Sequence, residues 1–246
     1  MTALFPDVSH YQGTVDWVKV KAAGAVGGVC KATQGKSGLD GYLPSNRARM
    51  RAAGIGVRGY YHFADILGDP VAQARWFVSK VGPLLTNEFY VLDIENGTTG
   101  SMMKNRAWVQ AFVDEVHRLT GLWTLIYTGP YYWTNAFGAW KPANCLLWDA
   151  HYTTASAPRL PAGWSAAALW QYTSSAVIPG ISTRADNSRV LGSLAGVLKP
   201  APVPPVTPPV TPSLPEDTMA IITRTEKGWL YLRAGGKLVG INPAAK

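Results

Sequence analysis

Cysteine is scarce in this 246-residue sequence. The two cysteines, Cys30 and Cys145, both lie in apolar runs, and their positions match neither a disulfide framework nor the spacing of metal ligands. A single bridge between them is possible, but two buried free thiols are the favoured interpretation. The four histidines show no metal-ligand spacing either. The sequence therefore predicts no metal and no other cofactor.

Long apolar segments are also missing. No run approaches the roughly 20 apolar residues that a membrane-spanning helix requires, so we expect no membrane insertion. The N-terminal residues MTALFPDVSHYQG lack the charged start and the apolar stretch of a signal peptide. We therefore expect the protein to be made in the cytoplasm and to need another agent to release it, if its target lies beyond the membrane.

Acidic residues are fewer than basic ones. The chain has 15 Asp and Glu against 23 Lys and Arg, a formal net charge of +8. Such a balance indicates either an anionic partner or simply solubility. Basic residues form no run: Arg47, Arg49 and Arg51 alternate with Met50 and Ala52 along a predicted helix. An acidic cell surface is thus a better candidate partner than nucleic acid.

Proline is concentrated in one segment, residues 199–215, with the sequence KPAPVPPVTPPVTPSLP. Proline fixes φ and lacks an amide hydrogen, so this segment is predicted to be an extended, semi-rigid linker. It separates a body of residues 1–198 from a tail of residues 216–246. The body has the length of a typical single domain.

The body begins with alternating strand and helix patterns, followed by strands joined mainly by loops. This order predicts an α/β fold: an irregular (β/α) barrel of about eight strands, with helices mainly in the first five units. The predicted strands are residues 4–7, 27–32, 57–63, 89–94, 122–127, 145–150, 167–172 and 184–190, and the predicted helices are 15–23, 43–53, 70–81 and 104–119.

The tail is predicted to be a small β-meander with strands at 221–225, 229–233 and 237–241. About thirty residues cannot bury a core of their own. The tail could pack on the body, assemble with other copies of itself or remain flexible. We favour self-association or contact with the target.

Two carboxylates follow the fourth predicted strand, in the segment Phe89–Gly97 (FYVLDIENG). Residues i and i+2 of a strand face the same side, so Asp93 and Glu95 point one way and Ile94 the other. In a barrel of this kind the chemistry lies at the carboxyl ends of the strands. Glycosidic hydrolysis needs an acid and a second carboxylate, and two close carboxylates divide these roles by shifting each other's pKa.

Two more aspartates occupy comparable positions. Asp7 ends the first predicted strand and Asp186 lies in the last one. In a closed barrel these strands are neighbours, so both residues could reach the mouth that Asp93 and Glu95 occupy. A cluster of four carboxylates would repel one another, which is typical of a functional site. On spacing alone, Asp7 and Asp186 could equally cap turns.

Several motifs together resemble glycoside hydrolase family 25, the lysozymes or N-acetylmuramidases of phages, bacteria and fungi. These are DVSHYQG, GYYHF, LDIE, IYTG, LWDAHY and LWQYTS followed by a late Asp, in order between Leu4 and about Val190. The resemblance implies an irregular α/β barrel that cleaves the β-1,4 bond between N-acetylmuramic acid and N-acetylglucosamine. It also implies bacterial peptidoglycan as the partner and, given the architecture, a phage endolysin made in the host cytoplasm.

The resemblance also assigns roles to the four acids. Glu95 corresponds to the general acid, and Asp93 to the carboxylate that stabilises the intermediate by orienting the 2-acetamido group of the substrate. Asp7 and Asp186 match the other acids of the family cluster, although Ala185 and Asn187 depart from the usual neighbours of the last one. Net retention is expected, through either an oxazolinium or a covalent intermediate.

Five other positions match the family's substrate-binding residues less specifically. Tyr61 and Tyr127 are expected near the reacting sugar and Lys31 at a strand end, while Trp148 could stack on a sugar ring and Gln171 could bond to one. Each of the five could instead belong to the barrel core or rim.

Three alternatives compete with the muramidase hypothesis. A chitinase-like barrel also carries Asp-x-Glu, but it needs acids earlier in the strand, where Val91 stands here. A peptidoglycan amidase would need a zinc site or a Cys/His pair. A catalytically silent module that binds cell-wall glycan is the main alternative, although a binder has no need of an acid beside a stabilising carboxylate.

Overall fold

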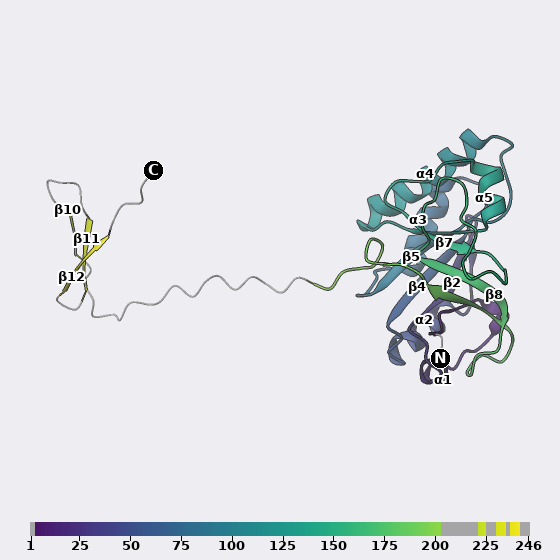
Figure 1. The fold of residues 1–246 in the computed structure, drawn as a ribbon, viewed down its shortest axis with the longest axis horizontal. Coiled ribbons are helices and arrows are strands. Elements are labelled where there is room, and N and C mark those ends of the chain that lie inside the picture. The colour runs from purple at the N-terminus through teal and green to yellow at the C-terminus, as the bar shows by residue number, and fades with distance from the viewer. Residues whose placement is uncertain (1–2, 203–220, 225–229, 235–236, 242–246) are drawn as a thin grey trace. The chain divides into compact units, whose positions relative to one another are not determined.

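The computed structural model describes residues 3–202, 221–224, 230–234 and 237–241 (Figure 1). The chain divides into two compact units, Met1–Pro202 and Val203–Lys246. The first holds the barrel and is described first.

The body is a closed eight-stranded barrel. Its strands run in the order β1-β9-β8-β7-β6-β5-β4-β2, and a parallel pairing of β1 with β2 closes the ring. A two-residue strand, β3 (Gly38–Leu39), adds to the edge of β2. The barrel strands are β1 (Pro6–Val8), β2 (Gly27–Gln34), β4 (Val57–Phe63), β5 (Glu88–Asp93), β6 (Leu125–Thr128), β7 (Leu146–Ala150), β8 (Leu169–Ala176) and β9 (Ala185–Val190).

One barrel strand, β9, does not run parallel to its neighbours, although alternating strands and helices are typical of a parallel sheet. β9 pairs antiparallel with both β8 and β1, and all other neighbours in the ring are parallel. The physical reason is the connection, because only residues 177–184 join β8 to β9. A parallel return needs a crossover of a dozen or more residues, usually a helix.

Helices follow the first five barrel strands, as predicted. They are α1 (Trp17–Ala22), α2 (Leu43–Ala52), α3 (Pro70–Val81), α4 (Met102–Thr120) and α5 (Pro130–Phe137), with a short 3₁₀ helix at His10–Gln12. The predicted bounds of α3 and β4 are met residue for residue. The sequence did not locate α5, whose aromatic-rich residues PYYWTNAF are weak helix formers. Pro130 at its first turn and Gly138 just beyond its end were the available signals.

The barrel has two separate apolar layers. Phe5, Val29, Phe89, Val91 and Leu125 belong to the inner cluster, whereas alternate residues of the same strands pack toward the helices. Gly59 makes room inside, since a Cβ there would lie 2.6 Å from the ring of Phe89. The interior is therefore filled with side chains up to the level where polar residues begin.

The amino ends of the strands are closed by a buried ion cluster. Glu88, at the start of β5, is fully buried and accepts two hydrogen bonds from Arg51 at 2.6 and 2.7 Å and one from Arg58 at 3.1 Å. The Tyr60 hydroxyl also donates to it at 3.1 Å. Lys199 exchanges backbone hydrogen bonds with Asn87 and Glu88. The body therefore ends at this side of the barrel, and Lys199 belongs to it rather than to the predicted linker.

In the second unit the structure describes three strands, β10 (Ile221–Arg224), β11 (Leu230–Ala234) and β12 (Lys237–Ile241), which pair antiparallel in chain order. The predicted meander is thus found at these residues. Most of the predicted linker lies outside the described residues, as do residues 225–229 and 235–236 between the strands.

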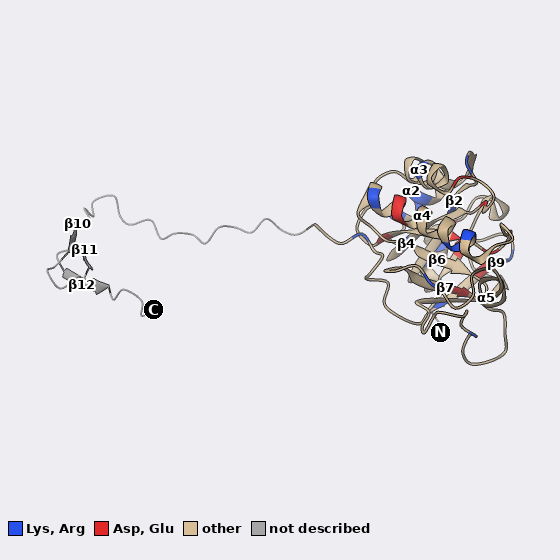
Figure 2. Ribbon diagram, turned by 90° about the horizontal axis from the view of Figure 1, so that it is seen from above, with Lys and Arg blue, Asp and Glu red and all other residues tan. Residues whose placement is uncertain are grey.

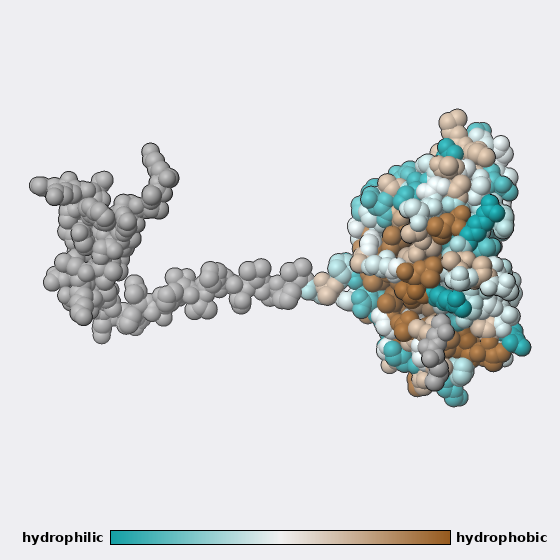
Figure 3. Space-filling view, in the orientation of Figure 1, coloured by the Kyte–Doolittle hydropathy of each residue, from teal (hydrophilic) through white to brown (hydrophobic). Residues whose placement is uncertain are grey.

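Four further observations concern the surface charge, the surface hydropathy, the length of the apolar helices and the two cysteines. Basic and acidic residues are interspersed over the face of the barrel in Figure 2, and apolar and hydrophilic side chains alternate over the face in Figure 3. Within residues 3–202, no helix combines the length and the apolar character needed to cross a membrane. Cys30 and Cys145 are free and buried, as predicted.

Candidate active site

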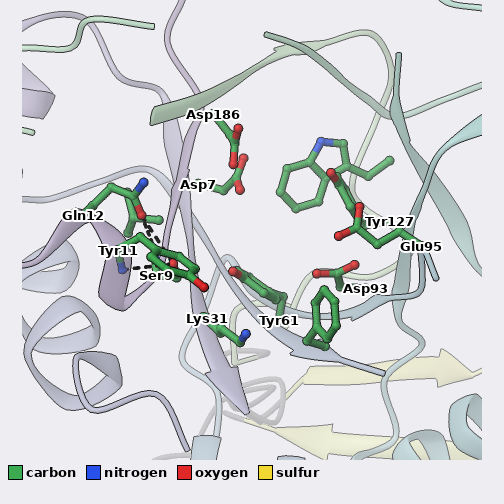
Figure 4. Close-up of a pocket in the computed structure, with 13 residues that line it drawn as sticks. Asp7, Ser9, Tyr11, Gln12, Lys31, Tyr61, Asp93, Glu95, Tyr127 and Asp186 are labelled. Carbon is green, nitrogen blue, oxygen red and sulfur yellow. Dashed lines mark hydrogen bonds between the residues drawn. The ribbon is translucent and has the colours of Figure 1, made fainter. Parts of the chain in front are cut away.

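A pocket opens at the carboxyl ends of the barrel strands, where a polar residue ends most of the apolar inner rows (Figure 4). On β5, for example, Phe89 and Val91 fill the interior and Asp93 follows them at the mouth. The lining residues are Asp7, Val8, Ser9, Tyr11, Gln12, Lys31, Tyr61, Phe63, Asp93, Glu95, Tyr127, Trp148 and Asp186. All four predicted acids are among them.

Asp93 and Glu95 share this pocket, as the strand alternation predicted. Asp93 is the last residue of β5 and is buried, whereas Glu95 lies two residues further and is exposed at the mouth. Ile94 between them is fully buried in the outer apolar layer. One of the two carboxyls is thus placed at the floor and the other at the opening.

Asp7 and Asp186 face each other across the β1–β9 pair, where they are direct partners in the register. Because β9 is antiparallel, its early residue Asp186 lies at the mouth, beside the carboxyl ends of the parallel strands. Burial and then the neighbouring Asp186 raise the pKa of Asp7, while Asp7 opposes the effect of burial on the pKa of Asp186. The antiparallel strand therefore completes the acidic cluster.

Every carboxyl in the cluster has a pKa above its usual value. Burial is the main cause at Asp7, Asp93, Glu95 and Asp186, and repulsion by the other carboxylates adds to it at the first three. Glu95 is accessible to solvent, but it lies in a concave pocket where protein replaces much of the surrounding water. The charge of Lys31 opposes the rise at Asp93 and Glu95. The cluster thus retains protons at a pH where isolated carboxyls would have lost them.

Lys31 lies on the wall of the pocket, close to two aromatic rings. Its Nζ is 6.0 Å from the centre of the Tyr61 ring and 4.8 Å from that of Phe63, and it donates to Gln34 at 2.7 Å. Burial lowers the pKa of Lys31, while Asp93, Asp40 and Glu95 counteract this effect. Lys31 therefore places a positive charge beside the acids.

Gln171 connects three side chains behind the pocket wall. It accepts hydrogen bonds from Tyr127 at 2.9 Å and from Tyr152 at 2.6 Å, and it donates to Asp7 at 3.0 Å. It is only 1% exposed and does not line the pocket. In this structure its amide is engaged by protein groups, which suits it to hold Asp7 and Tyr127 in place rather than to contact a sugar.

Trp148 lines the pocket, but its ring has little free surface. It is 2% exposed, its Nε1 donates to Ser188 at 2.9 Å, and it meets the Tyr127 ring edge-on at 4.9 Å. Tyr127 is itself nearly buried, and its hydroxyl also lies within hydrogen-bonding reach of Glu95. Trp148 thus shapes the pocket, and stacking on a sugar would require its ring to become more exposed.

Sequence reasoning did not single out five lining residues, Val8, Ser9, Tyr11, Gln12 and Phe63. Ser9 and Gln12 form a capping box that fixes the turn after β1, and this turn leaves Tyr11 77% exposed beside the pocket. Phe63 stands two positions after Tyr61 on β4, so strand alternation could have identified it. Among residues 3–202, no group of three or more His, Cys, Asp or Glu side chains is arranged to hold a metal ion.

The sequence matches the family model described as glycosyl hydrolases family 25 over residues 6–181, most of the barrel. The chain belongs to glycosyl hydrolase family 25. It is therefore a glycoside hydrolase.

Relatives and solved structures agree with the family. The chain is 33% identical to Lysozyme M1 of Streptomyces globisporus over 204 residues, which cover 78% of this chain and 69% of that protein. The crystal structure of a bacterial lysozyme from Streptomyces coelicolor superposes with a TM-score of 0.72 at 32% identity, covering 80% of this chain and 95% of that one. The catalytic domain of endolysin ply40 from bacteriophage P40 of Listeria monocytogenes gives 0.65 at 26% identity, with the same two coverages.

Proposed function

We propose that this family 25 enzyme hydrolyses the β-1,4 bond between N-acetylmuramic acid and N-acetylglucosamine in bacterial peptidoglycan. The observation that carries the proposal is the acidic cluster: an exposed carboxyl above a buried one, both with raised pKa values, in a pocket at the barrel mouth. Similarity to Lysozyme M1 and to the N,O-diacetylmuramidase of Chalaropsis sp, at 32% identity, supports the substrate.

Glu95 is the general acid in this proposal. Its carboxyl is the accessible member of the Asp93/Glu95 pair, and its raised pKa keeps it protonated to a higher pH than an isolated carboxyl. That proton passes to the glycosidic oxygen as the bond to the anomeric carbon breaks. The positive charge of Lys31, which lowers the pKa of Glu95, then stabilises the carboxylate that remains.

Asp93 stabilises the positive charge that develops at the sugar. A cation beside a buried carboxyl favours its ionised form, and Asp93 acts as its carboxylate, the form that the charge of Lys31 also favours. In the ionised state it orients the 2-acetamido group for attack on the anomeric carbon, which leads to net retention. Asp7 and Asp186 keep the negative potential of the cluster high, and Gln171 holds Asp7.

Substrate contacts are proposed for the residues that line the pocket. Lys31 and Tyr61 form one side and Tyr127 another, and each has polar atoms next to the acids. Trp148 and Gln171 support these contacts from behind. The body carries the chemistry, and residues 216–246, beyond the proline-rich linker of 199–215, serve self-association or cell-wall contact. A phage origin and release from a host cytoplasm complete the proposal.

Product analysis tests the proposal. Purified peptidoglycan is digested, the new ends are reduced with borohydride, and the products are identified by mass spectrometry. Muramidase cleavage exposes N-acetylmuramic acid at the new ends, and borohydride then reduces it to muramitol. Glucosaminitol would instead indicate cleavage of the other glycosidic bond, and new amino groups without reduced sugars would indicate an amidase. Wall binding without any product would leave the chain as a silent glycan-binding module.

A further inference from the structure

A cluster of three exposed residues and one half-buried histidine borders the pocket without lining it. It consists of Tyr131, His151, Tyr152 and Arg159, which we call the tyrosine–arginine rim. Tyr131 is the second residue of α5, directly after the carboxyl end of β6, and His151 and Tyr152 directly follow β7. Because β6 and β7 carry the lining residues Tyr127 and Trp148, the rim lies at the same mouth.

The rim is held together by its own contacts. The Arg159 guanidinium lies 5.1 Å from the centre of the Tyr131 ring, and the rings of Tyr131 and His151 are 6.2 Å apart. The Arg159 backbone amide donates to His151 Nδ1 at 2.9 Å, which pins the end of the intervening loop. The position of the arginine is therefore fixed by packing and by a hydrogen bond, unlike that of a free surface side chain.

Hydrogen bonds from Tyr152 and from Tyr132, a neighbour of the rim, reach residues next to the catalytic groups. Tyr152 donates to Gln171, the residue that also holds Asp7 and Tyr127. On the other side, Tyr132, the neighbour of Tyr131, donates to the backbone carbonyls of Asn96 and Gly97, directly after Glu95. A substrate seated over Glu95 would therefore extend past the rim.

The charge and exposure of the rim indicate which ligand it suits. Tyr131 and Tyr152 are 59% and 55% exposed, and Arg159 is exposed as well. Within residues 3–202, Arg159 has no carboxylate within salt-bridge distance. The adjoining pocket contains four carboxyls, so an anionic group of the substrate is repelled there and attracted to the arginine.

We propose that Arg159, held over Tyr131, binds a carboxylate on the substituent of a muramyl residue next to the cleaved bond. This inference rests on the proposed muramidase function. The carboxylate belongs to the stem peptide where one is attached, and to the lactyl group where the peptide has been removed. A guanidinium fork pairs with a carboxylate through two parallel hydrogen bonds, which fixes orientation as well as attraction. The rim thus determines which glycan strands the enzyme accepts.

The test compares Arg159→Gln with the parent on matched soluble glycan strands. One preparation keeps its stem peptides, a second has all carboxyls converted to neutral amides, and a third has its peptides removed by an amidase. We expect KM of the variant to rise roughly three- to tenfold on the native strands, as for a partly exposed charge-assisted contact, with kcat unchanged. On the amidated strands the variant and the parent should have equal KM.

The third preparation, which carries free lactyl carboxylates, identifies the source of the anion. On the native strands the lactyl carboxyl is tied up in an amide, so an effect there belongs to a stem-peptide carboxylate. A difference in KM on the third preparation shows that Arg159 also binds a free lactyl carboxylate, and its absence shows that Arg159 binds the stem peptide alone. Arg159→Lys should recover part of the effect, and Arg49→Gln, which removes an exposed arginine from α2, should have none. Equal KM on native strands, or an equal rise on native and amidated strands, overturns the inference. Absence of muramitol with the parent enzyme would instead refute the muramidase function itself.

Discussion

At the scale of single residues, Asp149 is a buried carboxyl that takes no part in the proposed chemistry. It follows Trp148 on β7 but faces the opposite side, and it is fully buried. Neither of its oxygens has a hydrogen-bond partner among the described residues, and neither does the hydroxyl of Thr128, its neighbour in the register. Burial raises the pKa of Asp149 to about 7. This carboxyl makes folding sensitive to pH.

We predict that Asp149→Asn gains stability relative to the parent as pH rises. Because the pKa of Asp149 is raised on folding from 3.8 to about 7, its contribution is complete below about pH 4 and is lost as pH rises through 7. The difference in unfolding free energy between variant and parent should shift by up to about 4 kcal/mol between pH 4 and pH 8. Urea unfolding at both pH values measures it. An equal difference at the two pH values would contradict the account.

The four acids show how far residue patterns could lead. Strand alternation alone predicted that Asp93 and Glu95 share a side, and the barrel topology predicted that Asp7 and Asp186 meet. The engagement of Gln171 with Tyr127, Tyr152 and Asp7 could not be predicted, because it depends on three strands and a loop meeting in space. The same holds for the burial of the Trp148 ring.

At the scale of secondary-structure elements, Glu88 ties β5 to its surroundings. Arg51 of α2 and Arg58 and Tyr60 of β4 all donate to its carboxylate. Burial raises the pKa of Glu88, but hydrogen bonds from Arg51, the Leu85 amide and Arg58 outweigh it, and the net pKa is lowered. The strand that carries Asp93 is therefore anchored at its opposite end by a buried ion cluster.

We predict that Glu88→Gln destabilises the body by about 3 kcal/mol or more, because it leaves two arginines near an uncharged, buried amide. Chemical denaturation at pH 7 measures this loss. The difference from the parent should shrink at acid pH, since the lowered pKa means that Glu88 loses its contribution as pH falls through its folded value. A loss of unfolding free energy below about 0.5 kcal/mol, as for an exposed ion pair, would contradict this prediction.

Elements were predicted best where their signals were local. The helix Pro70–Val81 has an aspartate cap and a proline at its start and a glycine after its end, and its bounds were found without error. The antiparallel direction of β9 was not anticipated, since alternation of strand patterns does not encode direction. Only the short connection of residues 177–184 constrains it.

At the scale of the whole molecule, the chain of the body ends on the side of the barrel opposite the pocket. Lys199 bonds to Asn87 and Glu88 at the amino ends of the strands, whereas the acids lie at the carboxyl ends. Residues 3–202 thus contain the barrel, the acids and the rim. We therefore expect the chemistry to be complete within this unit.

We predict that a chain ending at Pro202 keeps the kcat and KM of the full chain on short soluble glycan strands. On intact cell walls the shorter chain should bind less well, if the tail contacts the wall. Light scattering on both chains tests self-association, since only the full chain should exceed the monomer mass. A large loss of kcat on soluble strands would show that the second unit takes part in catalysis, contrary to the account.

The most direct test of the account is Glu95→Gln. A positioned general acid contributes about a hundredfold or more, so release of muramitol ends from peptidoglycan should fall by at least that factor. Unfolding temperature and glycan binding should remain near those of the parent, because Glu95 is exposed. Asp114→Asn, an exposed acid on α4, serves as the control and should retain full activity. If Glu95→Gln released muramitol at the parent's rate, Glu95 would not be the acid and the proposed mechanism would be wrong.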